Sequence, residues 1–338
     1  IDQDLTDKEE EAFASNHYAN LAEELPNQEV MKIGKELIKQ YEDDKSSRKD
    51  WEDQYSKGLK MLGVVVEDRQ DPFPGASGVH HPLMSEAATQ FQARAIGEMF
   101  PAGGPVKTQI IGKQSDKKLE QAQRVQDFMN YQVTNQITDY FNELDQLLYY
   151  LALAGSAFKK IYFDNSLDRI CSKFVPADQF VISMENTDLE TAERYTQVMK
   201  QTTNEIKRKQ IEGFYRDVPV SQNQGGQSTA DVVEKTLQKL EGMTPSMADK
   251  IHTILEIHAD LDLGEDESGL ALPYIVTVDY ESGQTLAIRR NWKEDDPLKR
   301  KRTYFIHYKY LPGLGFYGFG LIQMIGGLQH ASTGALRA

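Results

Sequence analysis

Residues 303–338 read TYFIHYKYLPGLGFYGFGLIQMIGGLQHASTGALRA. Tyrosine or isoleucine occupies every second position of 304–310, which is typical of a strand with one packed face. Pro312 then ends the strand. Three glycines follow with the spacing G-x-G-x-x-G: Gly313, Gly315 and Gly318. Behind them apolar and small residues recur at helical spacing, so the stretch predicts a strand, a glycine turn and a helix.

The same glycine spacing occurs in dinucleotide-binding loops, where pyrophosphate sits on a helix N-terminus. The strand before this loop argues against that interpretation, because it alternates and carries Lys309, whereas a first Rossmann strand is buried on both faces. The acidic residue expected about 20 positions further on has no counterpart, and Phe316 and Tyr317 place large rings in the loop. We therefore expect no cofactor, with a nucleotide-binding enzyme that uses the Gly313–Gly318 loop as an alternative.

The structural interpretation of these glycines is close packing. Gly315 and Gly318 let the chain turn sharply, and Gly326, Gly327 and Gly334 leave a smooth helix face. A glycine inside a helix costs about 1 kcal/mol relative to alanine, so such positions need a steric reason. We therefore expect helix packing or assembly contacts at the following glycines: Gly315, Gly318, Gly326 and Gly327.

The sequence GLGFYGFGLIQMIGGLQHAST at 313–333 resembles the strand, turn and helix of portal proteins, the head-to-tail connectors of short-tailed double-stranded DNA bacteriophages. Two upstream stretches resemble the same family in the same order. They are DPFPGASGVHHPLMSEAATQFQARAIGEMFPAGGPVKTQIIG at 71–112 and FNELDQLLYYLALAGSAFKKIYFD at 141–164. In all, the resemblance covers most of 71–215 and 303–338.

The resemblance implies an α+β fold, the wing region of a portal subunit, in which a helical N-terminal half packs on antiparallel strands. It implies a structural, non-catalytic subunit of a ring of about twelve copies at one capsid vertex. Double-stranded DNA passes through that ring during packaging and ejection. The implied partners are further copies of the chain, the terminase large subunit, the major capsid protein, and tail adaptor or head-completion proteins. The implied location is the virion, after assembly in the host cytoplasm.

Portal proteins continue into a stem, a clip and a crown, for which this chain has no matching positions. We therefore assign no motor-binding or channel-lining residue. Another virion or tail adaptor, which would share the helices without the three matching stretches, is the second alternative.

The chain predicts four regions. Residues 1–25 carry eight acidic residues against one lysine, which is typical of a mobile acidic tail. Residues 26–155 form the helical part, and residues 156–310 form the strand-rich part, with a helical insertion at 188–250. Residues 311–338 form the glycine turn and the start of a long helix.

Two local patterns within the strand-rich part lead to specific expectations. Asp188 is expected to cap a helix that runs through Met199, and Thr202 with Glu205 forms a capping box for a second helix. Leu255 to Leu261 alternate between apolar and polar residues, which predicts a strand with one solvated face. Asp260 lies on that segment and Asp262 directly follows it, but Gly264 takes the place of a ligand in an EF-hand loop, so we expect no calcium site there.

Composition limits the function further. The chain carries 38 basic and 52 acidic residues, a net charge of −14, so we do not expect it to bind the DNA backbone electrostatically. A basic run, Lys299, Arg300, Lys301 and Arg302, could contact DNA or an acidic partner. No apolar run reaches the roughly 20 residues that span a bilayer, so we expect no membrane contact.

No catalytic or metal-binding pattern stands out. Ser77 does not lie in the sequence pattern of a nucleophile elbow, and Cys171, the single cysteine, has no nearby histidine. The adjacent His80 and His81 are poorly placed to bind one ion, and no third ligand lies at a fixed offset. We therefore expect neither a catalytic residue nor a metal ligand.

Overall fold

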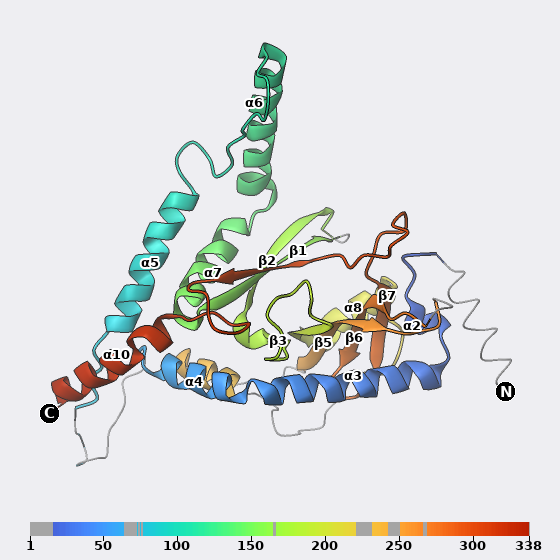
Figure 1. The fold of residues 1–338 in the computed structure, drawn as a ribbon. Helices are drawn as coiled ribbons and strands as arrows, with labels where there is room; N and C mark the ends of the chain where they lie inside the picture. Colours follow the sequence, from blue (N-terminus) through green and yellow to red (C-terminus); the bar gives the residue numbers. More distant parts are fainter. Residues whose placement is uncertain are drawn as a thin grey trace. The chain divides into compact units, whose positions relative to one another are not determined.

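The computed structural model describes residues 16–63, 73, 75, 77–164, 167–220, 232–242, 251–265 and 269–337. It has the α+β fold that the sequence predicts (Figure 1). The chain divides into two compact units. Unit 1 comprises Ile1–Ser56 and Asp178–Thr303, and unit 2 comprises Lys57–Ala177 and Tyr304–Ala338. Each unit combines helices with its own antiparallel sheet, so this division differs from the expected one into a helical part and a strand-rich part.

Unit 1 contains a five-stranded antiparallel sheet in the order β3-β4-β5-β6-β7. The strands are β3 (Phe180–Ile182), β4 (Arg194–Thr202), β5 (Ile251–Leu261), β6 (Leu272–Asp279) and β7 (Thr285–Arg290). β6 and β7 form a hairpin, and Gly283 in its turn has a φ of 67°, which favours glycine. The order follows the chain, so each strand pairs with its sequence neighbour.

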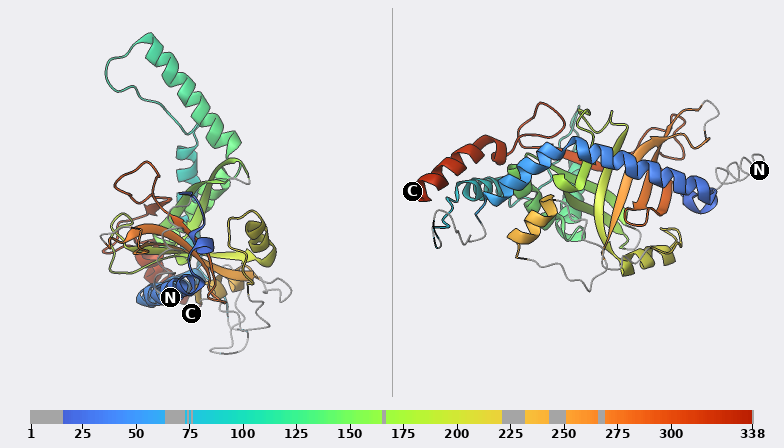
Figure 2. Two further views of the ribbon diagram at one scale, coloured as in Figure 1. Left: turned by 90° about the vertical axis from the view of Figure 1, so that its right-hand side faces the viewer. Right: turned by 90° about the horizontal axis from the view of Figure 1, so that it is seen from below.

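Helices cover both faces of this sheet. α2 (Leu21–Glu24) and α3 (Asn27–Ser47) contribute Leu21, Val30 and Leu37 to a core that includes Leu255 and Ile257 of β5. Figure 2 shows α3 running across the strands. On the other face, α8 (Thr203–Ile211) packs through Ile206 against Ile254 and Leu286. α9 (Val232–Leu240) also belongs to this unit, and α4 (Lys49–Lys60) begins in it.

One expectation for β5 holds only in part. The face that carries His258 was expected to be solvated, and Asp260 and Asp262 at its end are exposed, but His258 is 1% exposed and His252 is 4% exposed. The ring of His258 stacks on that of Tyr195, with centroids 4.7 Å apart. Alternation along a strand indicates two different faces, but only the tertiary packing decides whether the polar face is covered.

Two further expectations are wrong in unit 1. Residues 194–202 form β4 instead of continuing a helix from Asp188 to Met199, because they pair along their whole length with β5. Asp188 instead accepts hydrogen bonds from the backbone and hydroxyl of Thr191 and closes a turn. The capping box of Thr202 and Glu205 at the start of α8 is confirmed.

The second wrong expectation concerns the acidic N-terminal segment. Residues 1–15 lie outside the described residues, but residues 16–25 are packed in unit 1. The side chain of Asn20 accepts from the amides of Ala22 and Ile288 and donates to the carbonyl of Leu286. A mobile tail over 1–25 is therefore wrong for its described part.

Unit 2 contains a three-stranded antiparallel sheet in the order β2-β1-β8. The strands are β1 (Ser156–Asp164), β2 (Arg169–Pro176) and β8 (Phe305–Lys309). The helices are α5 (Leu83–Met99), α6 (Asp116–Tyr131), α7 (Tyr140–Ala154) and α10 (Leu321–Arg337), with a π turn at Gln132–Gln136. α7 provides the buried residues Leu144, Leu147 and Leu151, which pack with Phe91 of α5 and Phe174 of β2.

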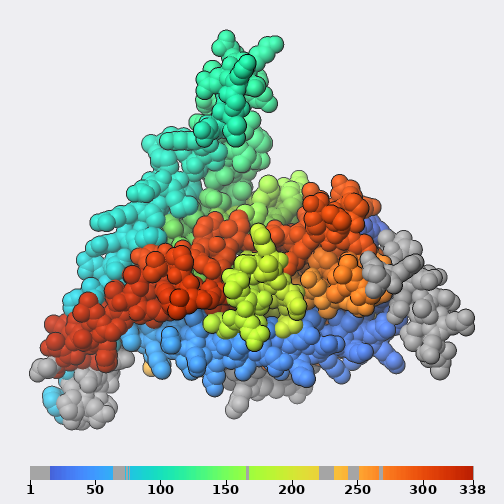
Figure 3. Space-filling model, in the orientation of Figure 1, coloured from blue at the N-terminus to red at the C-terminus, as the bar shows by residue number. Residues whose placement is uncertain are grey.

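α6 has no buried residue and extends away from the sheet of unit 2 (Figures 1 and 3). The adjoining segment 106–108 is tied to it by side chains. Asn130 accepts from the amide of Val106 and donates to its carbonyl, and Gln126 accepts from the amide of Thr108. These bonds hold the extended segment against the helix without a hydrophobic core.

Candidate functional site: the glycine turn and the helix that follows it

The predicted strand, glycine turn and helix at 303–338 are confirmed as β8, the segment 310–320 and α10. The turn packs against the junction of α7 and β1. Gly155 ends α7 with a φ of 80°, and its carbonyl accepts a hydrogen bond of 3.0 Å from the amide of Tyr310. A Cβ on Gly318 would come within 3.0 Å of the carbonyl oxygens of Gly155 and Leu311. Two stretches far apart in the sequence therefore meet backbone to backbone.

Ser156, the first residue of β1, links the turn to the sheet. Its hydroxyl oxygen accepts a hydrogen bond of 2.8 Å from the amide of Gly318. It also lies 3.0 Å from Nε2 of His307 on β8. The Gly318 amide, which a phosphate-binding loop would present to its ligand, is thus used inside the chain.

An aromatic stack lies beside Ser156. The ring of His307 stacks on Phe158, at 4.4 Å between centroids, and on Phe316, at 4.6 Å, and the two phenyl rings lie 6.0 Å from each other. Phe158 and Phe316 are both fully buried. Burial, together with the charge of Lys309, lowers the pKa of His307 to about 3. A neutral imidazole ring therefore packs against the two phenyl rings at neutral pH.

The four glycines predicted to make close contacts differ in their surroundings. Gly318 is tightly enclosed, but a Cβ on Gly315 would meet nothing within 4 Å, and the neighbouring Leu314 is 99% exposed. Gly326 faces Met61 and Met84 at ordinary van der Waals distance, and Gly327 faces open space. Within the described chain only Gly318 of the four has a steric reason to be glycine.

The helix that follows the turn has two contrasting faces. Its buried face contains Ile322, Gly326, Gln329 and Thr333. On the exposed face, Met324 and Leu328 are 54% and 61% exposed. A Cβ on Gly327 or Gly334, on that side, would meet no atom within 4 Å. Arg337 is the only Asp, Glu, Lys or Arg in α10.

A solvated helix normally presents charged residues to water, so an uncharged outer face is unusual. We call the surface of Met324, Gly327, Leu328 and Gly334 the α10 outer face. Figure 3 shows α10 in red along the molecular surface.

The basic run 299–302 is engaged in local contacts in unit 1. Arg300 pairs with Asp296 at 2.9 Å, and Lys301 donates to the carbonyl of Ala192. The ammonium group of Lys299 lies 5.9 Å from the ring centroid of Trp292. The amide of Arg302 donates to the carbonyl of Asn291. These contacts within unit 1 engage part of the basic run, so that part needs neither DNA nor an acidic partner to explain it. Arg300 and Arg302 are nevertheless exposed to solvent.

The histidines and the cysteine that the sequence analysis considered have structural surroundings. Nε2 of His80 lies 2.7 Å from Nη2 of Arg337, and the backbone of His81 bonds to the side chains of Thr333 and Gln329. Burial raises the pKa of the Cys171 thiol, which disfavours the thiolate. The two histidines thus connect the segment before α5 to α10 within unit 2.

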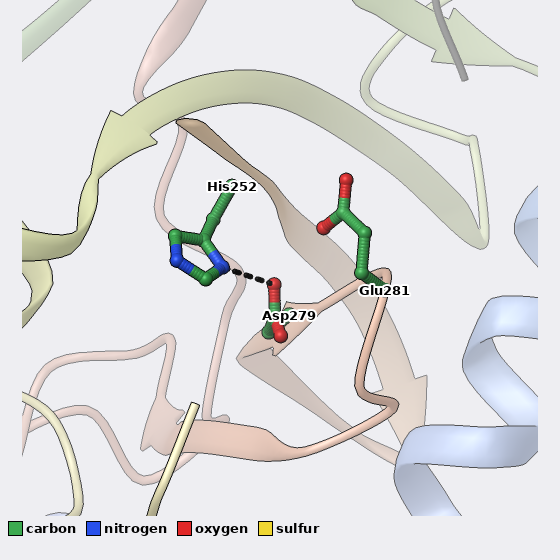
Figure 4. A group of neighbouring side chains, drawn as sticks. All are labelled: His252, Asp279 and Glu281. Carbon is green, nitrogen blue, oxygen red and sulfur yellow. Dashed lines mark ion pairs between the residues drawn. The ribbon is translucent and has the colours of Figure 1, made fainter. Parts of the chain in front are cut away.

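A cluster that the sequence analysis missed lies in unit 1. His252 of β5, Asp279 of β6 and Glu281 of the β6–β7 turn place one nitrogen and two carboxylate oxygens within 4.8 Å of one another (Figure 4). No sequence pattern links residues on different strands at this spacing. Only the strand register brings them together.

Comparison of the chain with protein-family models and with curated proteins found no match. Among the helices that the structure describes, none has both the length and the apolar character that a bilayer crossing requires.

Proposed function

We propose that the chain is a structural subunit of a portal ring, which encloses double-stranded DNA at one vertex of a phage capsid. The proposal starts from the three stretches that resemble portal proteins, at 71–112, 141–164 and 303–338. Apart from Thr303, all three belong to unit 2. These three stretches, distant in the sequence, therefore belong to one structural module, whereas residues 178–215 of the resembling region belong to unit 1.

The observation that carries the proposal is the α10 outer face. On this face the large apolar side chains of Met324 and Leu328 are more than half exposed, and the helix has only Arg337 as a charged residue. Burying such a surface is favourable by about 25 cal/mol for each Å² of apolar area removed from water. A ring repeats one head-to-tail contact between copies until the rotation closes, so each subunit needs such a surface. The exposed glycines would let a neighbouring subunit approach the helix backbone closely.

The charge of the chain suits a channel that DNA crosses without adhering. At −14 per chain, a ring of copies creates a negative field that repels phosphate groups over about one Debye length. The ring would hold DNA by enclosure and would bind it weakly.

The test uses the complete gene product. We expect light scattering to report a closed oligomer and negative-stain images to show a ring with a central hole. Leu328→Glu on the α10 outer face should abolish the ring, because a buried unpaired carboxylate is costly. Leu298→Glu is the matched control, since Leu298 is 73% exposed in a loop of unit 1.

Three outcomes would contradict the proposal. A monomer at micromolar concentration, or an oligomer without a central hole, would favour an adaptor protein instead. Tight binding of duplex DNA in a gel shift at about 150 mM salt would point to a DNA-binding protein. Micromolar binding of NAD, FAD or ATP that Gly315→Ala removes would restore the enzyme alternative.

A further inference from the structure

His252, Asp279 and Glu281 are brought to one place by the pairing of β5 with β6. Asp279 lies directly opposite Ile254, so its side chain shares a face with those of Ile254 and His252. One residue beyond the strand, the amide of Tyr280 donates to the carbonyl of Thr253. This extra bond continues the pairing and brings the turn residue Glu281 beside β5. The position of all three side chains thus follows from the backbone.

Each of the three side chains has one polar atom held by a neighbour. Nε2 of His252 lies 3.1 Å from the hydroxyl of Thr203. Oδ2 of Asp279 accepts from the amide of Ser282 at 3.2 Å, and Oε2 of Glu281 accepts from the amide of Thr253 at 2.9 Å. Outer hydrogen bonds of this kind orient the ligands of metal sites and fix the histidine tautomer.

The atoms that remain are Nδ1 of His252, Oδ1 of Asp279 and Oε1 of Glu281. Oδ1 of Asp279 lies 3.7 Å from Nδ1 of His252, too far for a hydrogen bond. Asp279 is completely buried, and this oxygen makes no hydrogen bond within the described residues. A buried carboxylate oxygen without a partner costs free energy, so the site as it stands is incomplete.

We propose that His252, Asp279 and Glu281 bind a divalent first-row transition-metal ion of the Zn²⁺ type. An imidazole nitrogen with two carboxylate oxygens suits Zn²⁺, whereas Mg²⁺ and Ca²⁺ prefer sites made of oxygen ligands alone. In a tetrahedral site with bonds of about 2.1 Å, ligand atoms lie about 3.4 Å apart, close to the separation of the His252 and Asp279 atoms. Glu281 is half-buried and reaches the site from the turn.

The ion would link β5 to the turn between β6 and β7 and would thereby stabilise unit 1. This inference is independent of the ring proposal, because none of its three residues lies in unit 2. It also revises the expectation of no metal ligand, which rested on spacing within short motifs.

The experiment uses the 338-residue chain without a histidine tag, treated with a chelator and then dialysed. We expect isothermal titration to show one Zn²⁺ bound per chain. At a Zn²⁺ concentration 100-fold above the dissociation constant, the melting temperature should rise by about 5 °C or more. Mg²⁺ at the same concentration should produce no rise.

Variants locate the binding. Glu281→Gln and His252→Gln should each weaken Zn²⁺ binding at least tenfold. His258→Gln is the matched control and should leave binding unchanged, because His258 lies on the same strand and contacts a carboxylate, that of Glu256 at 3.0 Å, outside the proposed site. Glu281→Gln decides the matter if His252→Gln does not fold, since Glu281 lies in a turn and is only half-buried.

Two results would overturn the proposal. The first is the absence of any Zn²⁺ binding or thermal shift, which would mean that a proton shared between the two carboxyl groups completes the site. The second is Zn²⁺ binding that survives in Glu281→Gln at full affinity, which would place the ion elsewhere in the chain.

Discussion

The hydroxyl oxygen of Ser156 accepts the amide hydrogen of Gly318 at 2.8 Å, so the first residue of β1 holds the glycine turn that precedes α10. Ser156 is fully buried. This one bond connects two of the stretches that resemble portal proteins, 141–164 and 303–338.

Ser156→Ala should lower the free energy of unfolding by about 1–3 kcal/mol, because it leaves the buried amide of Gly318 without an acceptor. Urea unfolding followed by circular dichroism measures the change. Ser172→Ala provides the control. Ser172 is also buried, on β2, and its hydroxyl makes no hydrogen bond within the described residues, so its loss should cost little. Equal losses in the two variants would contradict a specific role for Ser156.

Gly318→Ala should destabilise the chain by about 1–3 kcal/mol, because backbone atoms of Gly155 and Leu311 occupy the space that the methyl group needs. Gly315→Ala, in the same turn, should be nearly neutral because its Cβ meets open space. Melting temperatures of the two variants test this contrast. If Gly315→Ala were the more damaging, the steric account of the turn would be wrong.

Lys159→Met should stabilise the chain by about 2 kcal/mol at pH 7. Lys159 is 1% exposed, and its ammonium group lies 3.6 Å from the ring centroid of Tyr140 without a hydrogen bond in the described residues. Burial lowers the pKa of Lys159 to about 8, and the charge of Glu143 opposes part of this shift.

Because the pKa of Lys159 is lowered in the folded chain, the effect of Lys159 on the free energy of unfolding depends on pH. The unfolded chain takes up a proton near pH 10.5, whereas the folded chain does so near pH 8. The penalty therefore develops as pH falls from 10.5 to 8 and stays constant below pH 8. Unfolding at pH 7 and above pH 10 should show that the gain from Lys159→Met shrinks at high pH. A gain of the same size at both values would assign it to packing instead.

Acid should destabilise the chain through His307. Because the pKa of His307 is about 3 in the folded chain and 6.5 in the ordinary group, the unfolded chain gains a proton first as pH falls. Because of His307, the free energy of unfolding should therefore fall by about 1–2 kcal/mol from pH 7 to pH 5. His307→Phe retains an aromatic ring in the stack with Phe158 and Phe316 and should reduce this loss of stability. Melting temperatures at both pH values measure the effect. His330→Phe, on an exposed part of α10, should retain this loss.

Gly327→Leu should prevent the complete gene product from assembling while leaving the fold of the subunit intact. Nothing in the described chain lies within 4 Å of a Cβ at this position. The subunit should therefore gain helix stability of about 1 kcal/mol, which its melting temperature would report.

The control for Gly327→Leu is Gly97→Leu in α5, another helical glycine that faces open space. It should raise the melting temperature and leave assembly unchanged. A ring formed normally by Gly327→Leu would show that this part of the α10 outer face is free of subunit contacts.

The sequence by itself determined the local elements where periodicity and end signals agree. The strand at 305–309, the turn after Pro312 and the capping box at Thr202 are all present as predicted. These features depend on contacts between near neighbours in the chain, which is why spacing alone reveals them. The prediction of a helix over 188–199 was wrong because pairing with β5 outweighs local helix signals.

Only the tertiary structure decided which residues share a surface. The contact between Gly155 and Gly318, the burial of His258, the open space around Gly315 and the cluster of His252 with Asp279 and Glu281 all depend on strand register and helix packing. The sequence pattern of α10 shows small residues at helical spacing, but it does not show which of them face the core. That difference separates the buried Gly326 from the exposed Gly327, because adjacent residues of a helix point about 100° apart around its axis.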